Sequence, residues 1–263
     1  MRIFILTMDD PLYTIPFIKR IISERKNDIV GLTVIRGGRF KIGKDRSKPA
    51  YLLSLLLIMG LPFFIENTYK TLVFRVKNIL SQFRITNSGS IFHYAENLGI
   101  KTYVTTDPNN ENFLSVLRLN KPDIIINQSQ SILKAPLLNI PAIGTLNRHN
   151  ALLPRNRGRL SPFWILYKQE TETGVSIHFV DEGIDSGAII VQESFPVLAN
   201  DTFKSIVKKN YQIAPGLMLK ALDLLENGFN EFLENDRSKA TYNKVPTLYE
   251  AFDYRRKRIC RFY

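Results

Sequence analysis

The sequence contains almost no cysteine, with only Cys260 in 263 residues. A single thiol excludes an internal disulfide framework and any metal site built from several cysteines. A signal peptide is also missing, because residues 2–7 form a strand-like apolar run without a basic start, a long apolar middle or a small-residue end. These absences predict a protein of a reducing compartment, the cytoplasm.

Long uncharged stretches are scarce, and the longest covers the 17 residues 49–65. A membrane-spanning helix needs about 20 apolar residues, and Gly60 and Pro62 interrupt this stretch. We expect residues 51–65 to pack on the sheet or at a subunit interface, as in a homodimer. Peripheral contact with the inner membrane face is the alternative, because basic residues lie nearby at positions 44, 46, 48, 70 and 75.

Acidic residues are outnumbered, with 24 Asp and Glu against 36 Lys and Arg, so the formal net charge is +12. Such a field favours anionic partners, but it does not distinguish phosphates from nucleic acid or acidic lipid. With 44% hydrophobic residues, 17 Phe and 11 Tyr, the composition is that of a globular protein.

Strand-like runs alternate with segments of helical periodicity through the first half of the chain. The apolar runs cover residues 2–7, 28–35, 101–105, 123–127 and 142–147. This alternation predicts an α/β fold, with a Rossmann-like, mostly parallel sheet and helices on both faces. Two later runs, 174–180 and 188–195, are separated by only seven residues and predict an antiparallel pair.

The domain organisation follows from where this pattern changes. We expect a catalytic domain at residues 1–228, with an apolar helical insertion at about residues 45–85, and a short C-terminal extension at 229–263. The domain ends on a long amphipathic helix at residues 202–227, which Pro215 is expected to kink or divide. The basic run at 255–258 is typical of a solvated tail.

Polar residues with chemical potential follow the strand at 142–147. Asn147 and His149 are two residues apart, so on a strand they project to the same side and can hold an oxyanion together. Asp185, in a glycine-flanked turn, can approach the imidazole from behind and fix its tautomer. This set suits acyl transfer without a covalent nucleophile, because Cys260 is remote and no G-x-S-x-G elbow exists. His178, inside a strand, is interpreted as a packing residue.

The ordered set of motifs resembles the 10-formyltetrahydrofolate-dependent formyltransferases. The matching segments are Asn147-Arg-His149, Ala151-Leu-Leu-Pro154, Arg157-Gly158, Gly174-Val-Ser-Ile-His-Phe179, Asp185-Ser-Gly187 and Ile189-Ile-Val-Gln192. The resemblance is close over about residues 121–227, whereas residues 1–35 match only in their β-α-β pattern. It implies direct transfer of a formyl group from the folate to an amine, with Asn147, His149 and Asp185 as catalytic residues and no metal.

The resemblance also implies where 10-formyltetrahydrofolate binds, in the segment before the catalytic Asn and in the loop that leads to the Asp. The residues at these places are Ile126, Ser129, Ser131, Ile132, Leu133, Gly183 and Ile184. Many of the family's folate contacts are made by backbone groups. For a phosphorylated acceptor, Arg157 and Arg159 are the expected binding residues, with Arg148 and Arg155 equally eligible.

Departures from the family's branches indicate the substrate. Residues 7–13 lack the glycine-rich phosphate loop of glycinamide ribonucleotide formyltransferases. Fewer than 40 residues follow Asn227, too few for the barrel of methionyl-tRNA formyltransferases, and the regulatory domain of formyltetrahydrofolate hydrolases is absent. By elimination, we expect an amino-sugar substrate, carried on a nucleotide, for surface polysaccharide synthesis. The alternatives are an aminoacyl-tRNA substrate, although nucleic acid is disfavoured, and a non-catalytic folate- or nucleotide-binding module.

Overall fold

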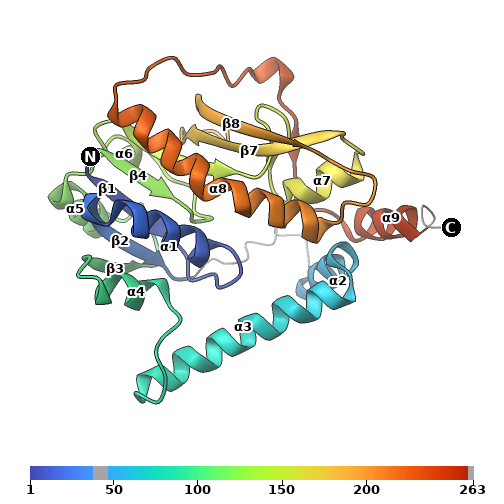
Figure 1. Ribbon diagram of the computed structural model, residues 1–263, viewed down its shortest axis with the longest axis horizontal. Coiled ribbons are helices and arrows are strands. Elements are labelled where there is room, and N and C mark those ends of the chain that lie inside the picture. The colour runs from blue at the N-terminus through green and yellow to red at the C-terminus, as the bar shows by residue number, and fades with distance from the viewer. Residues whose placement is uncertain (38–46, 260–263) are drawn as a thin grey trace.

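A computed structural model describes residues 1–37 and 47–259; Lys44, Arg46 and Cys260 lie outside this range. Its centre is a seven-stranded sheet in the order β3-β2-β1-β4-β5-β7-β8 (Figure 1). The strands are β1 (Ile3–Thr7), β2 (Ile29–Ile35), β3 (Thr102–Thr105), β4 (Ile124–Asn127), β5 (Gly144–His149), β7 (Glu172–Phe179) and β8 (Ile189–Pro196). The first five strands pair in parallel, whereas β7 pairs antiparallel with β5 and β8 pairs antiparallel with β7. The expected α/β fold with a mostly parallel sheet is confirmed.

Helices cover both faces of the sheet because alternate strand residues point to opposite sides. On one face, Ile3 and Ile5 pack with α1 (Thr14–Arg25), α4 (Ile91–Asn97) and α8 (Phe203–Glu226). On the other, Phe4 and Leu6 pack with α5 (Glu111–Asn120) and α6 (Ala135–Leu138). In Figure 1, α1 and α8 lie side by side in front of the sheet.

Helix α8 is a single helix of 24 residues with Pro215 in its interior, so the expected division at this proline was wrong. Thr202 and Ser205 close a capping box at its start. Proline removes one backbone hydrogen bond, but the buried residues on either side of it, Ala214 and Leu217, keep the helix packed on the sheet.

The segment after β2 forms two helices, α2 (Lys48–Met59) and α3 (Leu61–Gln82), as expected of an apolar helical insertion. Their buried residues do not pack on the sheet. Ile58 and Phe63 instead contact a cluster formed by α7 (Ser161–Tyr167), the start of α8, and α9 (Leu248–Ile259). Most of α3 extends along the lower side of the molecule (Figure 1), and only Phe63 and Asn67 of its residues are buried. Of the alternatives for residues 51–65, Ile58 and Phe63 thus pack in a core, which is this helical cluster and not the sheet.

The segment that follows α8, residues 227–259, folds back over the molecule. Leu233 bridges to Ile189, and the short strand β9 (Tyr242–Asn243) pairs in parallel with β6 (Arg157–Gly158). The expected solvated tail at residues 255–258 is instead part of α9, which packs on α2. The structure thus connects the C-terminal segment to both α2 and β6, whereas a domain boundary at residue 228 stays a prediction.

Membrane-spanning potential is limited to one pair of helices. Within residues 1–37 and 47–259, no single helix is long and apolar enough to cross a bilayer. Only α2 and α3 taken together reach that length and composition, and a bend of 119° separates them.

Candidate active site

The candidate site lies on the side of the sheet opposite α1 and α8. Leu146 of β5 points into the core beneath α8, so its neighbours Asn147 and, two residues on, His149 point to the other side. Strand register places Asn147 between Asn127 of β4 and His178 of β7. Four polar side chains from three strands therefore share one patch of the sheet.

The fold brings the side chains of His149 and Asp185 into contact. Their separation in the sequence alone does not require this contact. Nδ1 of His149 lies 3.4 Å from Oδ2 of Asp185, and Nε2 lies 2.8 Å from the backbone oxygen of Asn156. A carboxylate and a carbonyl both accept hydrogen bonds, so an imidazolium protonated on both nitrogens satisfies both contacts. His149 is only 6% exposed, which fixes the ring in this orientation.

Asp185 is held by its neighbours in a left-handed backbone conformation, with φ of 50°. The backbone N–H of Gly158 donates to Oδ2 at 2.8 Å. Burial of the carboxyl group raises its pKa, but His149, His178 and the Gly158 N–H outweigh this effect, so the pKa of Asp185 lies below its usual value. Asp185 is therefore an anion beside His149 at neutral pH.

The loop that carries Asp185 is tied to the C-terminal segment. Nδ2 of Asn235 donates to the backbone oxygens of Asp185, at 2.9 Å, and Gly187, at 2.8 Å. The amide oxygen of Asn235 accepts from Arg157 at 2.6 Å. Tyr242 of β9 adds a bond from its hydroxyl to the backbone oxygen of Ile184. Residues beyond α8 thus set the position of Asp185.

Asn147 is oriented by a second chain of contacts. Its amide oxygen accepts from Nε2 of Gln128 at 3.4 Å, and Oε1 of Gln128 accepts from Arg148 at 3.0 Å. Arg148 in turn lies over the ring of Tyr211 and donates to its hydroxyl. Because Gln128 uses the oxygen of the Asn147 amide, the amide nitrogen is the group that can donate to an oxyanion.

His178 is buried within the same patch. Its Nδ1 faces the backbone oxygen of Phe179 at 2.7 Å, and Nε2, which has no hydrogen-bond partner, lies 3.7 Å from Oδ1 of Asp185. Burial lowers the pKa of His178 to about 4, although Asp185 opposes this shift. His178 is therefore neutral at neutral pH. Its proton is on Nδ1, because the backbone oxygen of Phe179 can only accept a hydrogen bond.

The residues expected to bind folate lie in two loops near Asn147 and Asp185. Ile126 and Leu133 are buried in the two cores, so only their backbone groups can meet a ligand. Between them, Asn127 accepts from the backbone N–H and hydroxyl of Ser129 and shapes the turn that leads to Ser131 and Ile132. This turn lies beside Gln128, which contacts Asn147.

The second of these loops contains Gly183 and Ile184. Asp181 accepts from the backbone N–H of Gly183 and from the hydroxyl of Ser186, which closes a tight turn just before Asp185. Ile184 remains exposed at the tip of this turn. Folate contact by these residues, like that of the first loop, stays a prediction.

The arginines expected at the acceptor site lie in different surroundings. Arg157 is 2% exposed and donates to both oxygens of Asn235, so it supports the Asp185 loop. Arg159 is exposed on the surface and lies near Tyr51 of α2, where its charge opposes the rise in the pKa of Tyr51 that burial causes. Binding of an acceptor phosphate by either arginine stays a prediction.

The backbone N–H groups at the start of α1 are occupied by a carboxylate. Asp10 follows β1, and its side chain accepts from the backbone N–H groups of Leu12, Tyr13 and Thr14 at the start of α1. These N–H groups would otherwise attract an anion. The negative charge of Asp10 agrees with the missing glycine-rich loop and disfavours phosphate at this place.

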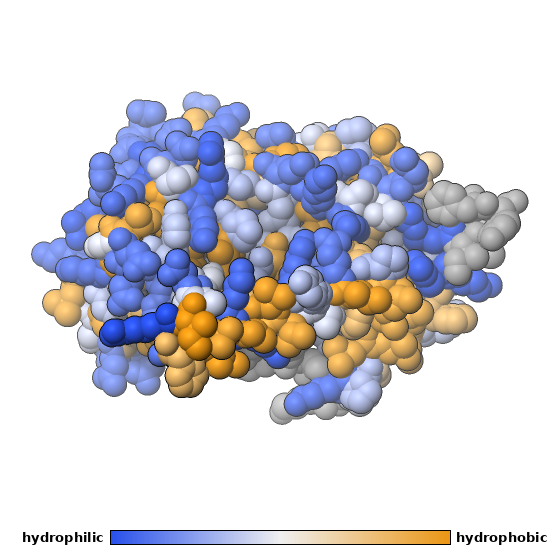
Figure 2. All heavy atoms as spheres, turned by 60° about the horizontal axis from the view of Figure 1, so that its bottom comes forward, coloured by the Kyte–Doolittle hydropathy of each residue, from blue (hydrophilic) through white to orange (hydrophobic). Residues whose placement is uncertain are grey.

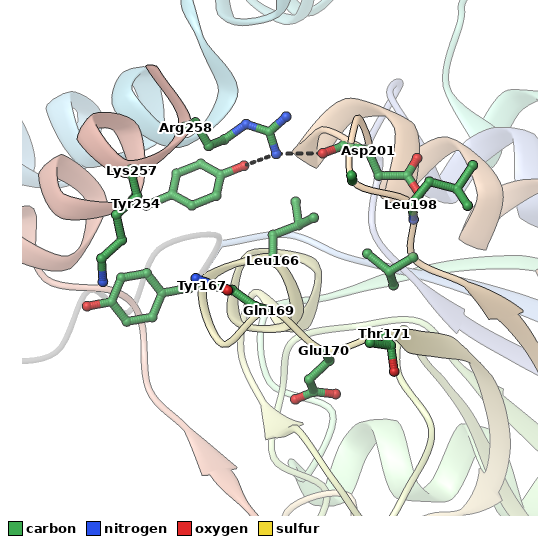
Figure 3. A pocket seen from close by; sticks show the side chains of 12 residues that line it. Leu166, Tyr167, Gln169, Glu170, Thr171, Leu198, Asp201, Tyr254, Lys257 and Arg258 are labelled. Carbon is green, nitrogen blue, oxygen red and sulfur yellow. Dashed lines mark hydrogen bonds between the residues drawn. The ribbon is translucent and has the colours of Figure 1, made fainter. Parts of the chain in front are cut away.

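A cavity of about 270 Å³ lies between α7, α9 and the segments that connect α7 with β7 and β8 with α8. Figure 3 shows Arg258 donating to Tyr254 and to the backbone oxygen of Asp201 across one side of it. Glu170 lines another side, and its carboxylate accepts from the side chain of Asn156. The lining includes none of the catalytic or folate-binding residues that the sequence predicts.

Several residues of this site were missed by sequence reasoning. Asn156 acts through its backbone oxygen, which no sequence pattern reveals, and Asn235 lies 78 positions from Arg157 in a polar segment without motifs. Asn127 had a usable signal, since it is a polar residue at the carboxyl end of a buried strand.

Asn147, His149 and Asp185 thus gather beside the strand ends of a Rossmann-like sheet, which is where open α/β sheets bind their ligands. A family profile described as formyl transferase matches residues 83–222, just over half of the chain. The chain belongs to the formyl transferase family, and the resemblance seen in its motifs is confirmed. These enzymes take their formyl group from 10-formyltetrahydrofolate.

The chain is similar in sequence to methionyl-tRNA formyltransferases. The chain is 29% identical to the methionyl-tRNA formyltransferase of Kosmotoga olearia over 213 residues, which are 75% of this chain and 68% of that enzyme. It is 37% identical to the methionyl-tRNA formyltransferase of Syntrophus aciditrophicus over 115 residues, 43% of this chain. That match spans only 37% of the second enzyme's length.

Solved structures share the fold at lower identity. The N-formyltransferase of Helicobacter canadensis, in complex with folinic acid and dTDP-3-aminofucose, is 17% identical with a TM-score of 0.56, covering 92% of this chain and 70% of that chain. The phosphoribosylglycinamide formyltransferase of Anaplasma phagocytophilum is 15% identical with a TM-score of 0.58, covering 93% and 99%. At this identity, both structures show a common fold.

Proposed function

We propose that this protein transfers a formyl group from 10-formyltetrahydrofolate to the amine of a nucleotide-linked amino sugar used in surface polysaccharides. The observation that carries the proposal is the contact of His149 with Asp185, beside Asn147, in a formyl transferase. The sugar acceptor is supported by the similarity in fold to an N-formyltransferase bound to dTDP-3-aminofucose. It is also supported by Asp10, which occupies the N–H groups that a phosphate loop would offer.

In the proposed reaction, the neutral amine attacks the formyl carbon and the carbonyl becomes a tetrahedral oxyanion. The amide nitrogen of Asn147 donates to this oxyanion, and the protonated His149 adds positive charge and a second donor by sharing its Nε2–H with Asn156. Asp185 faces Nδ1 of His149 and so orients the ring and places a negative charge behind it. Collapse of the intermediate breaks the bond to the folate nitrogen, which takes up a proton as it leaves, while the amine loses a proton through water, so no net proton is consumed.

A second candidate acceptor is aminoacyl-tRNA. It is favoured by the names of the relatives, which are methionyl-tRNA formyltransferases, and by the charge of +12. Binding to tRNA through this charge would weaken steeply with salt. A nucleotide-linked sugar, held by few phosphates, would show a much smaller salt dependence.

The test is a mass-spectrometric screen with 10-formyltetrahydrofolate and two acceptor sets, nucleotide-linked amino sugars and methionyl-tRNA. We expect one sugar to gain the mass of a carbonyl group, and the Asn147→Ala variant to give no such product. Formylation of methionyl-tRNA alone would reject the sugar acceptor. Folate binding without any product would indicate a binding module.

The cellular location of the enzyme is part of the same proposal. We place the enzyme in the cytoplasm, in agreement with its single cysteine. A homodimer and peripheral membrane contact through residues 51–65 are the two associations that the sequence predicts, and both concern the exposed sides of α2 and α3.

A further inference from the structure

Exposed apolar side chains are concentrated on α2, α3 and the turn that follows. Among the described residues, 22 large hydrophobic side chains are exposed, and ten of these lie between positions 52 and 85. We call this set the α2–α3 face; it consists of Leu52, Leu53, Leu61, Ile65, Tyr69, Leu72, Val76, Ile79, Phe83 and Ile85. Figure 2 shows hydrophobic residues in a band over this part of the molecule. Such a concentration on one segment marks a contact surface.

The exposed stripe along α3 is straight. Leu61, Leu72 and Phe83 follow one another at intervals of eleven residues, as do Ile65 and Val76. An eleven-residue period is close to the natural repeat of an α-helix, whereas the seven-residue period of a left-handed coiled coil makes helices wind around each other. The stripe therefore runs along the whole of α3, a length of about 33 Å. This geometry fits a flat partner.

The charges around the stripe are almost all positive. Lys70, Arg75, Lys77 and Arg84 lie on or just after α3, against a single acidic residue, Glu66. Glu66 is already paired with Lys70 and Lys204, at 2.6 Å each. Two copies of this chain meeting through the stripe would bring like charges together. An anionic surface is complementary to it.

The α2–α3 face is firmly joined to the catalytic domain. Ile58 and Phe63 pack in one cluster with Phe163 of α7. Ser161, at the start of α7, has its hydroxyl 3.3 Å from Nε2 of His149. A surface bound by α3 would therefore lie at a fixed distance from the active site.

We propose that the α2–α3 face binds the surface of a lipid bilayer that contains anionic headgroups, with α3 lying in the plane of the interface. The apolar stripe enters the boundary between headgroups and acyl chains, and the flanking lysine and arginine side chains reach the headgroup phosphates. This binding does not depend on which amine accepts the formyl group.

Vesicle flotation tests the proposal. The full chain is mixed with vesicles of phosphatidylcholine and phosphatidylglycerol in equal parts, or of phosphatidylcholine alone. We expect flotation with the mixed vesicles only, and release in high salt. Equal binding to the neutral vesicles, or none to the mixed ones, would overturn the proposal.

Two pairs of substitutions separate the apolar from the electrostatic part. Leu72→Glu with Ile79→Glu, at positions 58% and 57% exposed, is expected to weaken binding at least tenfold, by about the transfer energy of two side chains. Arg75→Gln with Lys77→Gln removes two charges and is expected to weaken it by up to roughly thirtyfold. The matched control is Leu119→Glu with Ile143→Glu, which makes the same chemical change outside the face and should leave binding unaltered.

Sedimentation without lipid tests the competing occupant, a second copy of the chain. A dimer that Leu72→Glu with Ile79→Glu converts to monomer would assign the face to self-association and overturn the proposal. Formyl transfer to a soluble acceptor should be equal in the wild type and this variant. Flotation without activity on any sugar would reject the proposed function alone.

Discussion

Asn235 holds the backbone of Asp185 through one amide group, which donates to the oxygens of Asp185 and Gly187 at 2.9 and 2.8 Å. Fifty positions separate Asn235 from Asp185. Because Arg157 fixes the amide from the other side, the orientation of the Asp185 loop depends on the segment after α8. An aspartate can orient a catalytic histidine only when supporting contacts fix the position of its own backbone.

Replacing Asn235 by Ala should therefore impair both folding and catalysis. The substitution leaves the buried carbonyl of Gly187 and the partly buried carbonyl of Asp185 without donors, and we expect a loss of about 3 kcal/mol in the free energy of unfolding in urea. In protein that remains folded, kcat should fall about tenfold or more with little change in the KM of the amine, because Asp185 moves relative to His149. Asn227→Ala is the control, since its exposed side chain makes one bond within α8; a similar loss there would contradict the assignment.

Asp185→Asn should remove a pH-dependent part of the stability. The pKa of Asp185 is lower in the folded protein than in the unfolded chain, so its contribution is full above pH of about 4 and is lost as the pH falls through the folded pKa. Thermal unfolding of both proteins measures this contribution. The difference between wild type and variant should be constant from about pH 5 to 8 and shrink below pH 4. A difference that grows towards acid pH would refute this interpretation.

The same Asp185→Asn variant should be nearly inactive, with kcat reduced about 10²- to 10⁴-fold. An amide in place of the carboxylate no longer places a negative charge 3.4 Å from Nδ1 of His149, so the ring loses the partner that orients it. The measurement is kcat with the amine and the folate donor at saturation, and turnover within threefold of the wild type would argue against a role for the His149–Asp185 pair.

Asn147→Ala should lose an oxyanion donor while keeping the fold. Removing one such donor costs about 10²–10³ in turnover. Its amide oxygen makes only a 3.4 Å contact with Gln128, so we expect little change in melting temperature. Asn112→Ala on the exposed surface of α5 is the matched control. Turnover of Asn147→Ala within threefold of the control would rule out its proposed role.

The fold was predictable where periodicity decides it. Strands β1, β2 and β4 follow runs of apolar residues, and the structure has them within one residue of the expected bounds. Helix α9 was missed because its sequence is polar, and it is stabilised by packing of Ala251 and Tyr254 on Ile58 and Phe63. Whether such a helix forms depends on contacts between segments that are distant in the sequence, and local patterns do not encode these contacts.

The site was predictable in part for a similar reason. The two-residue spacing of Asn147 and His149 on a strand is a local pattern, and the structure places both on the same side of the sheet. The support of Asp185 by Arg157 and Asn235 is not local, so Arg157 was interpreted by its charge alone. Its burial, with Nε lacking any partner, became visible only in three dimensions.

His178 offers a direct spectroscopic test of the site's electrostatics. The chain has only three histidines, and His93 is half exposed on α4 and serves as a surface reference in the same spectrum. Burial lowers the pKa of His178 to about 4. In an NMR titration, we expect the Cε1–H signal of His178, assigned by its loss in His178→Gln, to stay constant from about pH 8 to 5.5 and to move near pH 4.

The lowered pKa of His178 also has a consequence for stability. Because the unfolded chain takes up a proton near pH 6.5 and the folded protein does not, the stabilisation is full above that pH and is lost progressively as the pH falls towards 4. His178→Gln should flatten this part of the stability curve. A signal that titrates near pH 6.5 would contradict this interpretation. It would mean that Nε2 of His178 is protonated and donates to Asp185, so that His178 and not His149 carries the positive charge facing this carboxylate.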